Sequence, residues 1–148
     1  ARNGQVPRII QANSQAALGQ ALLQQVTNTA QNQPHWRIAI IGKSVQECEA
    51  LYAQLDEVQQ HAIQLITTED TFMKRRIMII PAFLAKGLEF DSVYAWNIGD
   101  NFTTSQDQLI LYTIATRGMH ELTVLVPNNQ SPLLEQLDAT TYQWQEVE

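Results

Sequence analysis

The sequence predicts an α/β fold in which helices pack against a largely parallel sheet, and three features support this prediction. Segments with the composition of strands alternate along the chain with segments of helical periodicity. The stretches 38–41 and 77–80, which lie within two of the expected strands, are apolar at every position, as is typical of strands buried on both faces of a parallel sheet. No repeat, low-complexity tract or linker divides the 148 residues. We therefore expect one domain, residues 1–148, with a core of its own.

Seven segments are expected to form strands, because they are short runs rich in β-branched and other apolar residues. They are 6–11, 37–41, 62–67, 77–80, 91–98, 121–126 and 142–147, the last of them an edge strand. The stretch between Ile80 and Ser92 is barely long enough for a crossover between parallel strands, which usually takes about a dozen residues.

Four segments have the apolar spacing or the start signals of helices. The first begins at Ser14, a plausible N-cap, and fades into a polar loop at 27–34. The third begins with the capping-box pattern Ser-x-x-Gln and should end at Gly118, a residue type that commonly follows a helix. The four expected helices are 14–26, 44–55, 105–118 and 131–137.

The composition argues against several classes of protein. The chain has 9 basic and 15 acidic residues, a net charge of −6, which is unfavourable for a free-standing protein that holds nucleic acid mainly by neutralising phosphates. The single cysteine, Cys48, cannot form an internal disulfide, so a reducing cytoplasm is expected. No apolar run approaches the roughly 18 residues that span a bilayer, no secretory leader is visible, and no metal-ligand spacing is present. The start at Ala1, without an initiator Met, suggests a piece of a longer protein.

The turn Gly42-Lys43-Ser44 has the layout of a phosphate-binding loop, because it joins an apolar strand to a helix. Such a loop needs a further glycine five positions before Gly42, and Arg37 occupies that position. Residues 38–41 would be strand, which cannot wrap phosphates. No apolar strand ends in the acidic residues that a complete nucleoside triphosphatase needs for Mg²⁺. We expect a strand-to-helix turn with Ser44 as N-cap and Lys43 in solvent, and no self-sufficient ATPase.

The first functional signal is a polar turn between two expected strands, within LAKGLEFDSV at 84–93. Its apolar residues should pin the turn to the core and leave Lys86, Glu89 and Asp91 free to point elsewhere. Open α/β sheets place ligands at such turns, at the ends of parallel strands. A solvated loop is the alternative interpretation.

The second signal is an expected helix that ends in one arginine directly before a strand, within LYTIATRGMHELTVL at 111–125. The side chain of Arg117 could complement the dipole at the carboxyl end of the helix. It could also place a planar guanidinium within reach of a phosphate, for which arginine suits better than lysine. The residues alone leave both roles open.

Together and in this order, the two segments resemble motifs V and VI of the UvrD/Rep-like superfamily 1 helicases, namely KGLEF before a strand and a helix ending in Thr-Arg. The variant IPAFLAKGLEFD at 80–91 is most similar to the HelD or helicase IV branch. Pro81 and Phe83 stand in the stretch where most relatives have a Thr and a His, and they are the candidates for nucleic-acid binding. The resemblance implies a RecA-like three-layer domain with helices on both faces of the sheet, the C-terminal lobe 2A.

The resemblance also implies roles for individual residues. Arg117 matches the motif VI arginine that reaches the γ-phosphate of ATP, and Thr116 precedes it as a further ATP-binding residue. Glu89 matches the carboxylate that accepts hydrogen bonds from the ribose, Gly87 permits close backbone approach, and Lys86 faces ATP or the nucleic acid. The implied cofactor is ATP with Mg²⁺. The Walker A and B residues and the Mg²⁺ ligands belong to a first lobe that this sequence lacks.

The implied function is that of the C-terminal motor lobe of an ATP-dependent superfamily 1 DNA helicase or translocase, inactive as an isolated piece. Its partners would be the N-terminal RecA-like lobe of the same chain and single-stranded DNA. HelD-like relatives act on RNA polymerase, so recycling of that enzyme is a second candidate role. The alternative from another class is a stand-alone α/β interaction or regulatory module without catalysis. The one basic run, 74–76, is either a solvated strand entry or a nucleic-acid contact.

Overall fold

The structure, a computed structural model, describes residues 7–97, 114, 117–127 and 143–147. Its strands are β1 (Arg8–Ala12), β2 (Ile38–Gly42), β3 (Gln64–Leu65), β4 (Ile77–Pro81), β5 (Phe90–Ala95), β6 (Gly118–Pro127) and β7 (Gln143–Val147). Its helices are α1 (Gln15–Asn32), α2 (Val45–Ala53), α3 (Glu57–Ala62) and α4 (Ala82–Ala85).

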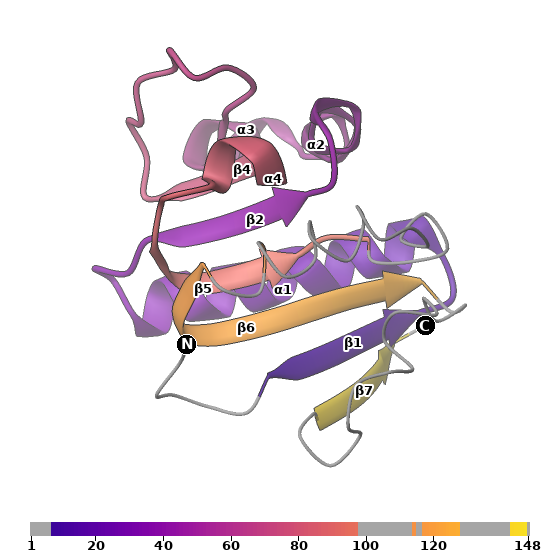
Figure 1. The fold of residues 1–148 in the computed structure, drawn as a ribbon. Helices are drawn as coiled ribbons and strands as arrows, with labels where there is room; N and C mark the ends of the chain where they lie inside the picture. Colours follow the sequence, from indigo (N-terminus) through magenta and orange to yellow (C-terminus); the bar gives the residue numbers. More distant parts are fainter. Residues whose placement is uncertain (1–6, 98–113, 115–116, 128–142, 148) are drawn as a thin grey trace.

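The strands of the described residues form one sheet in which every neighbouring pair is parallel. Their order across the sheet is β3-β4-β2-β5-β6-β1-β7 (Figure 1). The expected strand near the end of the chain is β7, which lies at one edge and pairs with β1. The predicted α/β fold with a parallel sheet is therefore confirmed.

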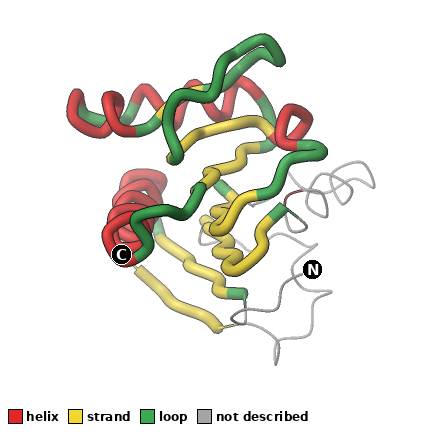
Figure 2. The backbone as a smooth tube through the Cα atoms, turned by 90° about the vertical axis from the view of Figure 1, so that its left-hand side faces the viewer, coloured by secondary structure: helices red, strands yellow, loops and turns green. Residues whose placement is uncertain are grey.

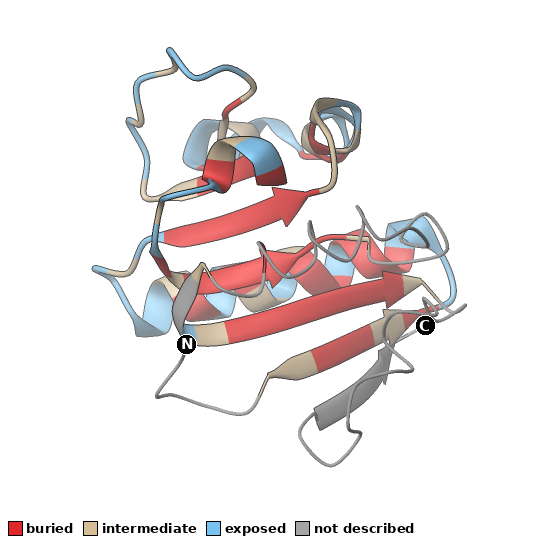
Figure 3. Cartoon of the chain, viewed as in Figure 1, coloured by how far each residue is buried: buried red, intermediate tan, exposed pale blue. Residues whose placement is uncertain are grey.

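The central part of the sheet is buried on both faces, as the apolar strands predicted (Figure 3). In β2, Ile38 and Ile40 belong to the core that α1 and α2 complete, whereas Ala39 and Ile41 belong to the core on the other face. The second core includes α4 and the helical residue Ile114. Figure 2 shows α1 on one side of the sheet and the short α4 on the other. Three layers result, with helices on both faces.

Helix α1 continues through the polar stretch 27–34 as far as Asn32, so the loop expected there is wrong. The buried Thr29 hydroxyl hydrogen-bonds the phenol of Tyr94 at 2.7 Å. The guanidinium of Arg76 donates to carbonyls at the end of the helix, at 2.9 and 3.1 Å. These contacts with distant strands compensate for a sequence of modest helix propensity.

The strand expected at 62–67 is reduced to the two residues of β3, because α3 precedes it. Asp56 and Gln59 cap α3 in both directions: the Asp56 carboxylate accepts from the Gln59 N–H, and the Gln59 side chain accepts from the Asp56 N–H. This capping box was readable in the sequence. Helix α3 has no buried residue, so it lacks the apolar periodicity by which helices are usually predicted.

The short crossover from β4 to β5 contains a single helical turn, α4. Strands β4 and β5 are not neighbours, since β2 lies between them. Helix α4 begins directly after Pro81, and residues 86–89 then lead into β5. The chain thus returns to the start of the next strand with very few residues.

Of the expected helix 105–118, the structure describes Ile114, which is helical and buried, Arg117, which lies in a turn, and Gly118, which begins β6. The expected helix 131–137 lies outside the described residues. None of the described helices has the length and apolar character needed to cross a bilayer.

Candidate functional site

The two segments that carry functional signals meet side by side in the sheet. Strands β5 and β6 are parallel neighbours, and Phe90 at the start of β5 is in register with Gly118 at the start of β6. The Phe90 N–H donates to the Arg117 carbonyl at 2.9 Å. The pairing of these two strands therefore brings the KGLEF turn and Arg117 together.

The site lies at the amino-terminal edge of the sheet, which corrects the expectation that it would lie where parallel strands end. Residues 86–89 precede β5, and Arg117 directly precedes β6. Open α/β sheets usually place ligands at the opposite, carboxyl edge. Here α4 carries the chain away from the carboxyl end of β4, so the polar turn lies at the entrance of the next strand.

The turn has an apolar underside and an exposed polar surface. Its Leu88 is partly buried against the core and Phe90 is fully buried, so the expected apolar anchors are confirmed. The Leu88 N–H donates to the Ala85 carbonyl at 3.0 Å and closes the turn. The charged residues Lys86 and Glu89 are exposed.

Gly87 holds the turn in a backbone conformation that other residues adopt at a cost. Its φ is +85°, in the region that favours glycine. A Cβ built at this position would meet no atom within 4 Å, so the glycine is needed for its φ angle and not to avoid a clash inside the domain. The open space outside Gly87 leaves room for a ligand.

The side chain of Arg117 lies against this turn. Its Nη1 donates to the Leu88 carbonyl at 3.4 Å, its Nε is buried, and the residue as a whole is half-buried. Its backbone N–H donates to the carbonyl of the buried Ile114, which fixes the end of the helical segment to the core. One guanidinium is thereby held against the turn that carries Lys86 and Glu89. The predicted ATP-binding residue Thr116 lies outside the described residues.

A second group of polar side chains surrounds the start of β2, and the sequence did not single it out. The Asp91 carboxylate accepts from the Arg37 N–H at 2.8 Å and lies 3.6 Å from Nε2 of His120. The His120 ring stacks on Trp36 with centroids 5.0 Å apart. Asp91 therefore ties strands together and does not point away as expected. The sequence contained a signal for this group of side chains, because Trp36 and Arg37 directly precede a buried strand.

The candidate nucleic-acid contacts differ in accessibility. Pro81 is buried at the carboxyl end of β4, where it is in register with Gly42. Phe83 lies on α4 and is 61% exposed. A nucleic acid could reach only the Phe83 side chain without a change in structure, and its contact stays a prediction.

The turn after β2 is the strand-to-helix connection that was expected. Gly42 ends β2, and the Ser44 hydroxyl accepts from the Glu47 N–H at 3.2 Å as the N-cap of α2. A Cβ at Gly42 would lie 2.8 Å from Sγ of Cys48, so helix and strand approach closely here. This turn lies at the carboxyl edge, opposite the KGLEF turn. In the described part of the chain, no three acidic, His or Cys side chains are grouped as metal ligands.

The basic run at 74–76 divides into two parts. Arg76 is partly buried and donates to the carbonyls of Ala30, Gln33 and Trp36. Lys74 and Arg75 are exposed. Arg76 therefore has a structural role directly before β4, whereas Lys74 and Arg75 are cations at the surface.

No model of a known protein family and no curated protein matches the chain. Among solved structures, it is similar to the crystal structure of the C-terminal domain of a possible DNA helicase from Lactobacillus plantarum WCFS1. The TM-score is 0.82 and the sequence identity is 34%, over 95% of this chain and 86% of that one. The chain belongs to the family of this helicase C-terminal domain.

Proposed function

We propose that the chain is the C-terminal motor lobe of an ATP-dependent superfamily 1 DNA helicase or translocase, with the HelD or helicase IV branch as its nearest kin. The single observation that carries this proposal is the contact between the Arg117 guanidinium and the Leu88 carbonyl. It brings together the two segments that resemble motifs V and VI. The related domain of a possible DNA helicase supports the same assignment and favours DNA over RNA polymerase as substrate.

The residues at the amino-terminal edge fit one side of a nucleotide. Glu89 offers an exposed carboxylate for ribose hydroxyls, and the space outside Gly87 is open. Arg117 offers a planar fork of donors suited to phosphate oxygens. When bound between this lobe and the first one, ATP with Mg²⁺ would supply the phosphoryl group that water attacks.

The role of this lobe is electrostatic and positional. The Arg117 guanidinium would neutralise charge that develops on the transferring phosphoryl group, the role of an arginine finger. Its hydrogen bond to Leu88 and the paired backbones of β5 and β6 would fix it relative to Glu89. Because the nucleotide would touch both lobes, its binding and release would close and open the cleft between them, and the lobes would then move along single-stranded DNA.

The test is DNA-stimulated ATP hydrolysis by the longer protein in which this lobe is proposed to work. Arg117→Ala should lower kcat by about 10³-fold or more, the usual effect of losing an arginine finger. Arg8→Ala is the matched control, because Arg8 is also half-buried, at the amino end of β1, and makes one hydrogen bond to Thr123. Turnover unchanged by Arg117→Ala, with ATP still bound, would exclude the arginine-finger role.

A further inference from the structure

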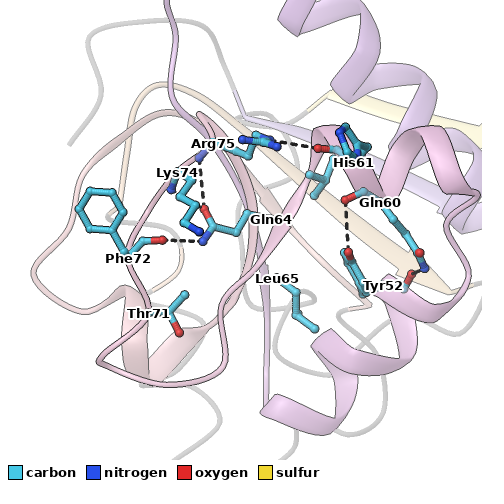
Figure 4. Close-up of a pocket in the computed structure, with 10 residues that line it drawn as sticks. Tyr52, Gln60, His61, Gln64, Leu65, Thr71, Phe72, Lys74 and Arg75 are labelled. Carbon is cyan, nitrogen blue, oxygen red and sulfur yellow. Dashed lines mark hydrogen bonds between the residues drawn. The ribbon is translucent and has the colours of Figure 1, made fainter.

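A cleft lies at the side of the sheet where β3 forms the edge, away from Arg117 and the KGLEF turn. Its volume is about 480 Å³, within the range of ligand-binding clefts. It is formed by α2, α3, β3 and the loop between β3 and β4, and Figure 4 shows the residues that line it. None of these lining residues is acidic, and three of them are His61, Lys74 and Arg75.

Gln64 of β3 holds the loop that forms one wall of the cleft. Its amide Nε2 donates to the Phe72 carbonyl at 2.7 Å, and its Oε1 accepts from the N–H groups of Lys74 at 2.7 Å and Arg75 at 3.2 Å (Figure 4). The Arg75 Nε donates to the His61 carbonyl at 3.0 Å on the facing helix. One half-buried side chain on the edge strand thus fixes the backbone at three lining positions, 72, 74 and 75, so the wall is formed before any ligand binds.

Phe72 is the unusual member of this wall. It is 76% exposed, and Figure 4 shows its ring at the rim of the cleft, turned away from the carbonyl that Gln64 holds. Exposure of so much of a phenyl ring has no benefit for folding. The ring and the two exposed cations Lys74 and Arg75 lie in one short stretch of chain.

We propose that this cleft binds single-stranded nucleic acid, with a base stacked on Phe72 and the adjoining phosphates near Lys74 and Arg75. Sequence-tolerant binding of single strands uses this combination of an exposed aromatic ring and cations. An acidic polypeptide would be attracted by the cations but would leave the Phe72 ring without a stacking partner. Two nearby carboxylates line other hollows, Glu57 one beside Val58 and Glu69 one beside Phe83. The exposed Asp70 lies in the same loop but does not line the cleft.

This inference rests on the proposed function for its choice of nucleic acid, but its test needs neither ATP nor Arg117. The 148-residue chain is suitable, because it has its own two-sided core and the related C-terminal domain was crystallised as a separate domain. Binding of a labelled oligothymidylate of about 15 nucleotides, the size that one binding fold can cover, is followed by fluorescence anisotropy.

Phe72→Ala should weaken binding by roughly 5-fold to 100-fold, the range for loss of one stacked base. The double variant Lys74→Ala/Arg75→Ala should also weaken binding and should lower the slope of log K against log salt by about 1.4, for two phosphate contacts. Val58→Ala and Lys43→Gln are the controls, because Val58 is an exposed apolar residue and Lys43 a cation in the turn after β2, and neither lines the cleft. Both controls should bind like the wild type.

Three results would overturn the proposal: no binding at low salt, equal affinities of Phe72→Ala and Val58→Ala, or displacement by polyglutamate as strong as displacement by unlabelled oligothymidylate. The last would identify a surface for acidic polypeptides. If Arg117→Ala abolishes ATP hydrolysis in the longer protein while Phe72→Ala leaves binding intact, only the cleft assignment fails. If Phe72→Ala weakens binding while Arg117→Ala leaves ATP hydrolysis unchanged, the cleft assignment stands and the arginine-finger role fails.

Discussion

Cys48 is the residue whose burial has the most direct chemical consequence. Its side chain is completely buried between α2 and β2, and burial raises the pKa of the thiol from 9.0 to about 12. Burial also raises the pKa of Tyr94 above its ordinary value of 10.0. In both cases the fold stabilises the neutral form, because ionisation would place an anion in the core.

We predict that alkaline pH destabilises the fold through this thiol. Its folded-state pKa is raised, so the stability associated with its protonated form is fully present below pH 9 and is lost as the pH rises toward 12. In that window each unfolding event releases up to one proton from Cys48, which lowers the free energy of unfolding by about 1.4 kcal/mol per pH unit. Tyr94 should add to the loss above pH 10.

Urea unfolding at several pH values between 7.5 and 11 measures this effect. Cys48→Ala should be less stable at every pH because it leaves a cavity, but its stability should fall less steeply above pH 9. Parallel curves for the wild type and Cys48→Ala would show that another group controls the alkaline loss.

At the level of elements, Arg76 connects two parts of the chain that are distant in sequence. Its guanidinium donates to three carbonyls, those of Ala30, Gln33 and Trp36, while its own carbonyl accepts from the Ile38 N–H at 2.8 Å. A cation at this position also complements the dipole of α1. One residue therefore fixes the end of α1, the start of β2 and the start of β4.

Arg76→Ala should destabilise the fold by about 1–3 kcal/mol, since it leaves partly buried carbonyls without a charged donor. Arg75→Ala, which removes a single hydrogen bond from an exposed neighbour, is the matched control and should cost less than about 1 kcal/mol. Thermal unfolding followed by circular dichroism compares them, and hydrogen exchange should show faster opening of the last turn of α1 in Arg76→Ala only. Equal effects of the two substitutions would show that the hydrogen bonds of the Arg76 guanidinium do not hold α1 to the sheet.

The elements that the sequence predicted well are those whose signals are local. Apolar runs such as 38–41 and 77–80 became central strands, and Ser14 and Ser44 became N-caps. The length of α1 was underestimated because Tyr94 and Arg76, both far along the chain, supply its last contacts. Helix α3 was missed because it contributes no buried face, although its capping box was visible.

For the whole molecule, the sequence predicted which segments form the candidate site but not the edge of the sheet on which they lie. That depends on the strand order and on the one-turn helix α4, which periodicity does not reveal in so short a segment. The pairing of the KGLEF turn with Arg117 was expected from the resemblance and has its physical basis in the β5–β6 ladder. The contacts of Asp91 and the cleft beside Gln64 require residues from several elements distant in sequence, and no short motif encodes them.

The pairing of the first and last described strands has a mechanical consequence. Strands β1 and β7 are adjacent and parallel, with Arg8 opposite Gln143 and Ala12 opposite Val147. A force that pulls the amino end of β1 away from the carboxyl end of β7 acts along both strands, so the hydrogen bonds between them are loaded together. A force applied at the two carboxyl ends would instead open the ladder one bond at a time.

Single-molecule stretching should therefore need a higher force with handles at the two ends of the chain than with handles at Asn13→Cys and the chain's carboxyl end. Equal rupture forces would mean that another part of the domain yields first. In the proposed role as a motor lobe, this resistance to load along the strands would keep β1 and β7 paired while force acts on the domain.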